Sequence, residues 1–500
     1  MIKLEYVVFF LLFAGSGAYV WHFFRRLRRD HFSKLVERAF LRRQASGGEN
    51  AFFCEPLLRR IVVLLLRDGK KALRPLLALT LGRHTPAEKY LRSRGRELEA
   101  LLLRAHVSPQ RALPGLKKYV RKNPQNRFAL AALAELCFVA GDAGHGQAAL
   151  DNISLKRAPR YVLGIYWYYQ TSFYLREGDM LAASQACVRA EKYFLREKAF
   201  YAAARCRLLM GTVYRVCFVE DVASFMFRGA LKIFEQLHCP QGRAAAFGNL
   251  GMLNALTEHF DEAQGYFEQA RELYDGINAV RGRAEIDNQL GLLEILRRNF
   301  SRAEKYLQTA AQGHEQADSL PGLALNAELF SYLEAARNRH VRICHVLSRR
   351  YAEKAEELYR RIGNESARLE SLYLQAEAWY AGKKDKKAET VLRRIIQEAG
   401  GHSTSFHIAN AYSLLGLVFM RRGELQRAKG LFQQSLEQEQ KNDRWSGQAC
   451  DYANIGLLEL RCGRKEQAET HLNAALELAL NLDNREMADF LKRELEKLKA

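Results

Sequence analysis

Residues 250–270 read LGMLNALTEHFDEAQGYFEQA, and four positions in this stretch recur along the chain. Gly251 is followed after twelve residues by the small Ala263, after sixteen by the large Phe267 and after nineteen by the small Ala270. The same pattern starts again at four other glycines: Gly211, Gly291, Gly416 and Gly456. Small residues let two antiparallel helices cross closely, and the large residue fills the space beside the crossing. The pattern therefore predicts stacked helical hairpins.

The repeats, with a period of 34 to 40 residues, resemble the tetratricopeptide family over most of the chain. One repeat matches nearly the whole family consensus through Trp167, Thr171, Tyr174, Gly178, Asp179, Ala183 and Ala190. The eighth position of each repeat falls at residues 100, 134, 171, 211, 251, 291, one near 331 to 336, 376, 416 and 456. The resemblance implies an all-α fold, a right-handed superhelical solenoid of about ten antiparallel helix pairs. The 85 residues from Gly291 to Ala376 exceed two forty-residue units by five, which predicts an insertion or a lengthened helix there.

The N-terminus is predicted to carry a membrane anchor. Residues 6–24, YVVFFLLFAGSGAYVWHFF, contain no Asp, Glu, Lys or Arg, and about 20 apolar residues span a bilayer as a helix. Four arginines follow at once: Arg25, Arg26, Arg28 and Arg29. Because positive flanks stay in the cytoplasm, we expect one span, with the N-terminus outside and the repeats in the cytoplasm. A cleaved signal peptide is the alternative, but its apolar core is shorter and a small-residue cleavage site follows it.

The predicted organisation has five parts. These are a transmembrane anchor at 1–24, a basic juxtamembrane helix and linker at 25–50, a degenerate helical cap at 51–92, the repeats at 93–483 and a capping helix at 484–500. Residues 1–125 carry 26 Lys and Arg against 9 Asp and Glu, which accounts for +17 of the net charge of +21. We expect this basic excess, including the four arginines, to contact anionic lipid head groups. Nucleic-acid binding is disfavoured, because no groove of interleaved basic and aromatic residues is apparent.

The sequence lacks the motifs of catalysis and of metal binding. It has no phosphate-binding glycine loop, no HExxH, no GxSxG and no acidic calcium loop, so we expect no enzyme activity and no cofactor. In the cluster His340, Cys344 and His345, the first two residues lie one helical turn apart and could reach one metal ion. No carboxylate or further ligand follows at a defined spacing, and we predict that the cluster binds no metal. The nine cysteines form no CxxC pair and are predicted to be free thiols, several of them buried.

The family resemblance implies that the first helix of each repeat lines a concave groove in which partner peptides lie. Carried onto this sequence, it gives these groove candidates: Tyr168, Arg176, Arg205, Arg215, Asn249, Gln289, Arg421, Asn454 and Arg461. Asn249, Gln289 and Asn454 share one repeat position, where amides could hold the backbone of an extended peptide, or could instead bond the adjacent repeat. The arginines favour carboxylate recognition. The expected partner is another protein or an extended, acidic peptide.

An anchor followed by such repeats resembles the layout of bacterial inner-membrane assembly and regulatory factors, and also that of mitochondrial import receptors. The first resemblance implies a location at the bacterial inner membrane. The sequence therefore predicts a scaffold or adaptor that recruits other proteins at the cytoplasmic face of a membrane. The alternative from another class is a ligand- or peptide-sensing regulator, in which the solenoid closes around its ligand. Regulators of this kind carry an effector domain, and the only segment that could hold one, residues 51–99, looks more like degenerate repeat helices, which favours the scaffold.

Overall fold

The structure is a computed structural model that describes residues 85–499, apart from 108, 140–141, 178, 218, 338–341, 400–405, 442–443 and 483. Four earlier positions, 61, 65, 68 and 75, are also described. The predicted anchor at Tyr6–Phe24, the arginines Arg25, Arg26, Arg28 and Arg29, and the linker lie outside the described residues. None of the described helices combines the length and the apolar character that a membrane span requires.

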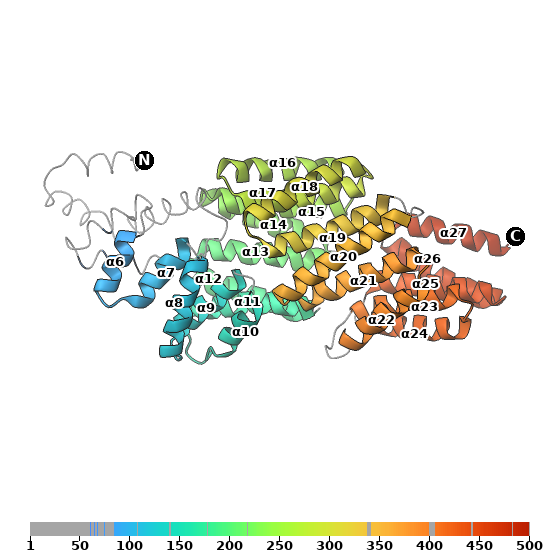
Figure 1. Cartoon of the computed structure of the whole chain (residues 1–500), viewed down its shortest axis with the longest axis horizontal. Helices are drawn as coiled ribbons and strands as arrows, with labels where there is room; N and C mark the ends of the chain where they lie inside the picture. The colour runs from blue at the N-terminus through green and yellow to red at the C-terminus, as the bar shows by residue number, and fades with distance from the viewer. Residues whose placement is uncertain are drawn as a thin grey trace. The chain divides into compact units, whose positions relative to one another are not determined.

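The described part of the chain is all-α, as predicted, and contains no strand (Figure 1). Its helices are α6 (Thr85–Ser93), α7 (Glu97–Val107), α8 (Pro109–Lys122), α9 (Arg127–Val139), α10 (Ala143–Asp151), α11 (Arg160–Glu177), α12 (Met180–Arg196), α13 (Phe200–Val216), α14 (Glu220–Gln236), α15 (Pro240–Leu256), α16 (Phe260–Gly276), α17 (Val280–Leu296), α18 (Phe300–Gln316), α19 (Leu320–Arg337), α20 (Arg342–Ile362), α21 (Glu365–Ala381), α22 (Asp385–Ala399), α23 (Phe406–Arg421), α24 (Leu425–Lys441), α25 (Trp445–Arg461), α26 (Lys465–Asn481) and α27 (Arg485–Lys499).

Helices α7 to α26 follow one another as consecutive pairs, and the marker position of every predicted repeat lies on the first helix of a pair. The spacing seen in the sequence explains why each pair crosses closely. A β-carbon on Gly251 of α15 would stand 2.6 Å from the ring of Phe267 on α16, and one on Gly416 of α23 would stand 2.5 Å from the ring of Phe432 on α24. Both rings are fully buried, so glycine and phenylalanine together set the depth of the crossing.

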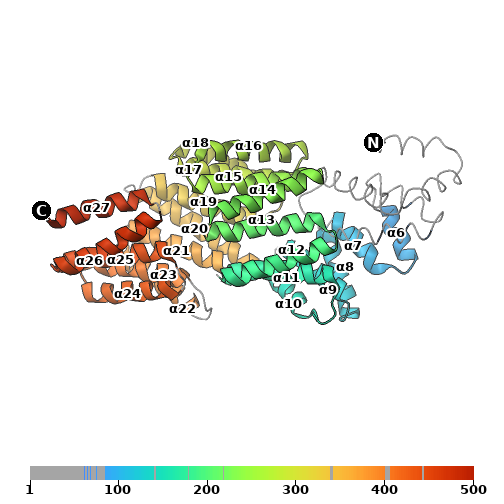
Figure 2. The same cartoon turned by 180° about the vertical axis from the view of Figure 1, so that it is seen from behind.

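The first helices of neighbouring pairs lie closer together than the second helices. α13 contacts α15, and α23 contacts both α21 and α25, whereas α14 and α16, or α24 and α26, make no comparable contact. Seen from behind, α13, α14 and α15 follow one another in this order (Figure 2). A stack that is tighter on one side curves toward that side. The first helices therefore form the inner, concave layer within each part of the repeat array.

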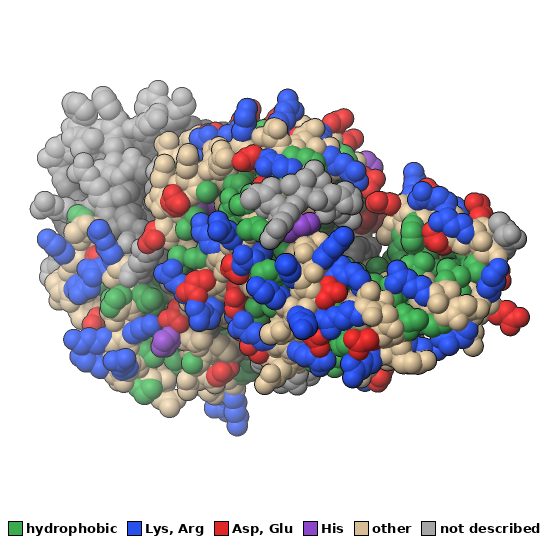
Figure 3. Space-filling model, turned by 45° about the vertical axis from the view of Figure 1, so that its right-hand side comes forward, with side chains coloured by type: hydrophobic (Ala, Val, Ile, Leu, Met, Phe, Trp, Pro, Cys, Tyr) green, Lys and Arg blue, Asp and Glu red, His purple; other side chains and the backbone are tan. Residues whose placement is uncertain are grey.

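The chain divides into two compact units, and each is described by itself. Unit 1 comprises the described residues up to Leu175, Met180–Leu293 and Gln312–Ser319, and unit 2 comprises Arg176–Asp179, Glu294–Ala311 and the described residues from Leu320 onward. In unit 1 the core continues through α7, α9, α11, α12 and α13, and it includes Cys187, Cys206 and Tyr169. On the face shown in Figure 3, basic and acidic side chains are interspersed.

The lengthening that was predicted between Gly291 and Ala376 lies in unit 2. Ser331 stands forty residues after Gly291 and lies on α19, so the regular period continues to that point. The five additional residues fall between α19 and α21. Here α20 has 21 residues, whereas the second helices α24 and α26 have 17. This placement agrees with a lengthened helix.

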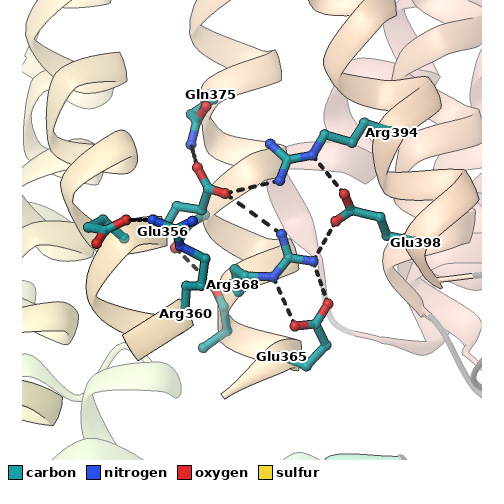
Figure 4. Close-up of polar contacts among 10 residues, drawn as sticks. Glu356, Arg360, Glu365, Arg368, Gln375, Arg394 and Glu398 are labelled. Carbon is teal, nitrogen blue, oxygen red and sulfur yellow. Dashed lines mark hydrogen bonds and ion pairs between the residues drawn. The ribbon is translucent and has the colours of Figure 1, made fainter. Parts of the chain in front are cut away.

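An ion-pair network joins the longer α20 to α21 and α22 (Figure 4). The side chain of Arg368 is only 8 % exposed and pairs with Glu365, with Glu398 and, at 3.7 Å, with Glu356. Arg394 donates from Nε to Glu398 at 2.8 Å and pairs with Glu356 at 3.3 Å. One guanidinium thus holds three carboxylates from three helices.

The last helix, α27, covers the end of the array. Ala488, Leu491 and Leu495 pack against buried residues of α26 such as Leu472. Met487 of the same helix is partly buried against this cluster, while Phe490 is 40 % exposed. The helix therefore closes the core of unit 2 at its C-terminal end.

Candidate functional site

A recess opens on the first-helix layer of unit 1. Its volume is about 20 Å³, which is the room that one water-sized group occupies. First helices α9, α11 and α13 supply most of its lining, and α12 supplies one aromatic ring. The lining residues are Glu135, Tyr161, Ile165, Tyr168, Tyr169, Phe194, Ala202 and Arg205.

Arg205 is the central side chain of this recess. Its Nη2 donates to the hydroxyl of Tyr168 at 3.2 Å, and its guanidinium carbon lies 4.9 Å from the centroid of the same ring. Its Nη1 lies 3.5 Å from Oε1 of Glu135. Two residues predicted from the sequence to face the groove, Tyr168 and Arg205, are therefore in direct contact, although they lie 37 residues apart.

Glu135 is the most unusual residue of the recess. It is 4 % exposed, and its Oε2 has no hydrogen-bond partner among the described residues. Burial raises the pKa of this carboxyl to about 7, although the neighbouring Arg205 opposes the shift. A carboxyl group of this kind changes its charge close to neutral pH.

Aromatic packing holds the walls in place. Tyr169 stacks on Phe138 with the ring centroids 4.4 Å apart, and Tyr161 meets Phe194 edge to face at 5.6 Å. Tyr168 contacts Tyr169 edge to face at 5.1 Å. Because Tyr169 is 7 % exposed, it belongs to the core, whereas the half-buried Tyr168 faces the recess.

The other groove candidates of unit 1 lie apart from the recess lining. The half-buried Arg215 has an Nε without a hydrogen-bond partner among the described residues, and burial lowers its pKa. Asn249 donates to the carbonyl of Ala245 at 2.8 Å, within its own helix. Gln289 has a buried Oε1 without a partner in the described structure. The side chain of Arg176 lies outside the described residues.

In unit 2 the predicted groove residues bind neighbouring repeats. Arg421 pairs with Asp385, donates to the carbonyl of Tyr380 at 2.9 Å and stacks 3.7 Å over the ring of Tyr380. Arg461 donates to the carbonyl of Met420 at 3.3 Å. Asn454 donates to the hydroxyl of Ser413 at 3.2 Å. The amide row at Asn249, Gln289 and Asn454 thus has two members whose donors are used within the fold.

The sequence argument missed two features of the first-helix layer. Glu135 directly follows the marker Ala134, and none of the predicted groove candidates lies at this repeat position. In unit 2 the tyrosine hydroxyls of Tyr332 and Tyr359 donate to Glu370 at 3.2 Å and to Glu328 at 2.8 Å. This part of the face carries carboxylates, opposite in sign to the arginines that were expected to bind an acidic peptide.

No group of three or more metal-binding side chains lies together in the part of the chain that the structure describes. In the cluster that was predicted to bind no metal, Cys344 is buried and His345 is half-buried, while His340 lies outside the described residues. The described cysteines are all free thiols. Five of them are buried: Cys137, Cys187, Cys206, Cys239 and Cys344.

Comparison with known proteins identifies tetratricopeptide repeats in this chain. Residues 407–481, which include α24, α25 and α26, match the tetratricopeptide repeat family model. None of the curated proteins matches the chain.

Several solved structures are similar at low identity. A signal-transduction ATPase with a tetratricopeptide repeat sensor from Pyrococcus horikoshii is 12 % identical, with 75 % of this chain and 69 % of that chain covered and a TM-score of 0.47. A Rap protein complexed with competence and sporulation factor is 12 % identical, with 88 % and 98 % covered and a TM-score of 0.42. Yeast Tom70 is also 12 % identical, with 88 % and 96 % covered and a TM-score of 0.40.

Proposed function

We propose that this chain, which carries tetratricopeptide repeats, is a scaffold or adaptor that recruits a partner protein through its first-helix layer at the cytoplasmic face of a membrane. The recess around Arg205 supports this proposal most directly. It places a cation, aromatic rings and a carboxylate oxygen that has no partner among the described residues together on the inner layer. Buried polar groups and aromatic side chains in a concave surface are typical of binding sites.

The sharpest test compares the inner and outer layers with variants that remove the same charge. Arg205→Ala with Arg215→Ala alters the first-helix layer of unit 1. Arg196→Ala with Arg228→Ala removes two exposed arginines from the second helices α12 and α14. Both variants of the full chain are crosslinked in intact cells and purified with their captured partners.

We expect the inner-layer variant to lose a specific set of partners that the outer-layer variant retains, at a temperature at which both variants are folded and with an equal membrane fraction. Equal capture by both variants would contradict binding through the inner layer. Failure of the unaltered chain to capture any protein would favour the alternative, a ligand- or peptide-sensing regulator.

The membrane part of the proposal rests on the apolar stretch Tyr6–Phe24 and the arginines that follow it. An integral anchor resists extraction by alkaline carbonate, whereas a peripheral protein is released. We expect the full chain to stay in the membrane pellet and a chain lacking residues 1–24 to be released. Added protease should reach the repeats only when the cytoplasmic face is exposed. Release of the full chain by carbonate would rule out the anchor.

A further inference from the structure

The recess of unit 1 is lined by a buried carboxyl group with one unpartnered oxygen. Oε2 of Glu135 has no hydrogen-bond partner among the residues that the structure describes, and the residue is only 4 % exposed. A buried polar atom without a hydrogen-bond partner destabilises the fold. Such atoms therefore normally form a hydrogen bond with water or with a ligand.

The nearest donor cannot fill this position while it keeps its present contacts. Arg205 uses Nη2 for the hydroxyl of Tyr168, and its Nη1 faces Oε1, the other oxygen of Glu135, at 3.5 Å. A planar guanidinium holds its donors in a fixed fork, so moving one to Oε2 would disrupt the others. Within the described part of the chain, no side chain supplies the missing donor, and a water molecule or a bound ligand could supply it.

The size and chemistry of the recess limit what that donor can be. About 20 Å³ is enough room for a water-sized group. Glu135 lines the recess and its unpartnered oxygen is an acceptor, so a group that bonds this oxygen must carry N–H or O–H. The lining also includes the rings of Tyr161, Tyr169 and Phe194 beside Arg205, and aromatic rings attract cations.

We propose that this recess binds a primary ammonium group of the partner protein, from a lysine side chain or an N-terminus, with Oε2 of Glu135 accepting its hydrogen bond. The proposal rests on the proposed scaffold function and gives it a chemical specificity. Arg205 and the ammonium share one carboxylate, which lies between the two cations. Because the ammonium needs an ionised carboxylate, its binding releases the proton that Glu135 holds below neutral pH.

The groups that face Glu135 give this pH dependence one direction. Arg205 remains cationic, and burial raises the pKa of Tyr168 and Tyr169 above the range of the experiment. Of these, only Glu135 changes charge near pH 7. Ammonium binding should therefore tighten as the pH rises from 6 to 8.

The test uses the full chain and propylammonium, with propionamide as the neutral probe and propionate as the anionic probe, all at equal ionic strength. Binding is measured by saturation-transfer NMR. We expect the chain to bind propylammonium in preference to the other two, with tightening toward pH 8. Glu135→Gln, which keeps the shape of the side chain, should weaken propylammonium roughly tenfold and remove the pH dependence.

Two further variants make this result specific. Ala202→Leu fills the recess without changing any charge and should also abolish binding. Glu191→Gln removes a carboxylate of the same unit that pairs with Arg207 at 2.7 Å, outside the recess, and should change nothing. Equal binding of propylammonium and propionamide, or binding that survives Glu135→Gln, would mean that the recess holds only water and would overturn the proposal.

Peptides identify the source of the ammonium. An acetylated peptide with one lysine tests the side chain, and a lysine-free peptide with a free N-terminus tests the terminus. Binding of either, lost in Glu135→Gln, supports the proposal. The scaffold function is tested by a different result. Equal partner capture by the inner-layer and outer-layer variants would contradict it, regardless of whether propylammonium binds.

Discussion

The ring of Phe267 fills the space in which a side chain on Gly251 would lie. A β-carbon at Gly251 would stand 2.6 Å from Cε1 of that ring, closer than real side chains approach one another. The same relation joins Gly416 to Phe432 and Gly456 to Leu472, at 2.5 and 2.7 Å. At these three crossings the glycine is therefore a packing requirement.

Gly251→Ala should destabilise unit 1. The added methyl group must displace a fully buried ring, and overpacking of this kind costs about 1–3 kcal/mol. Urea unfolding of the full chain, followed by circular dichroism, measures the change.

Gly265→Ala on α16 is the matched control in the same helix pair. No atom lies within 4 Å of the added β-carbon, so the substitution gains helix propensity without a clash. It should stabilise by about 0.5–1 kcal/mol. Equal effects at Gly251 and Gly265 would show that packing against Phe267 is not limiting.

Arg368→Met should destabilise unit 2. It leaves Glu356, Glu365 and Glu398 close together without the guanidinium that holds them (Figure 4). Breaking a fully buried pair costs about 3–5 kcal/mol, and because these carboxylates are partly exposed we expect about 1–3 kcal/mol. Thermal unfolding at low and high salt measures the loss.

Arg360→Met is the control for that substitution. Arg360 pairs with Glu357, but the two side chains are 65 % and 52 % exposed. An exposed pair contributes little, so the free energy of unfolding should change by less than about 0.5 kcal/mol. A comparable loss from both variants would contradict a special role for the buried Arg368.

Glu135 should make the fold less stable as the pH rises. The folded pKa of about 7 exceeds the ordinary value of 4.5, so the folded chain keeps a proton that the unfolded chain releases between these values. The stability that this proton contributes is fully present below pH 4.5 and is lost as the pH rises through 7. The difference corresponds to about 3 kcal/mol.

Glu135→Gln should therefore flatten the pH dependence of unfolding. Burial also raises the pKa of Glu328 and of Glu439 to about 7, so the wild-type slope includes other groups. Only the difference between wild type and variant is assigned to Glu135. Urea unfolding at pH 5 and pH 8 measures it, and identical slopes would mean that this carboxyl is ionised throughout.

Thiol labelling should separate two groups of cysteines. Cys217 and Cys450 are exposed and should react with iodoacetamide in the native chain, whereas Cys187, Cys206 and Cys239 are buried and should react only after unfolding. Mass spectrometry of the labelled chain identifies the sites. Rapid native labelling of Cys187 would contradict the packing of α12 against α13.

The sequence identified the repeats because both partners of each crossing lie within one helix pair at a fixed spacing. Gly251 and Phe267 are sixteen residues apart, and this separation recurs wherever the crossing recurs. The register was lost near residue 331, where Ser331 replaces the glycine and α20 is longer. Because the pattern depends on both residues of the crossing, the repeat cannot be aligned from the sequence where one of them is replaced.

The recess could be predicted only in part. Tyr168 and Arg205 were selected by repeat position, but nothing in the sequence indicated that they touch each other or that Glu135 meets them. Repeat position specifies which way a side chain points. It does not specify which neighbour forms a hydrogen bond with that side chain. Asn249 and Asn454, for example, both donate to groups of the protein itself.

By itself, the sequence determined the helical hairpin, its period and the residues at its crossings, because these depend on sterics within one repeat. The tertiary structure alone decided the burial of Glu135 and its unfilled oxygen. These properties arise where α9, α11, α12 and α13 meet, and they depend on the solvent that the neighbouring helices exclude.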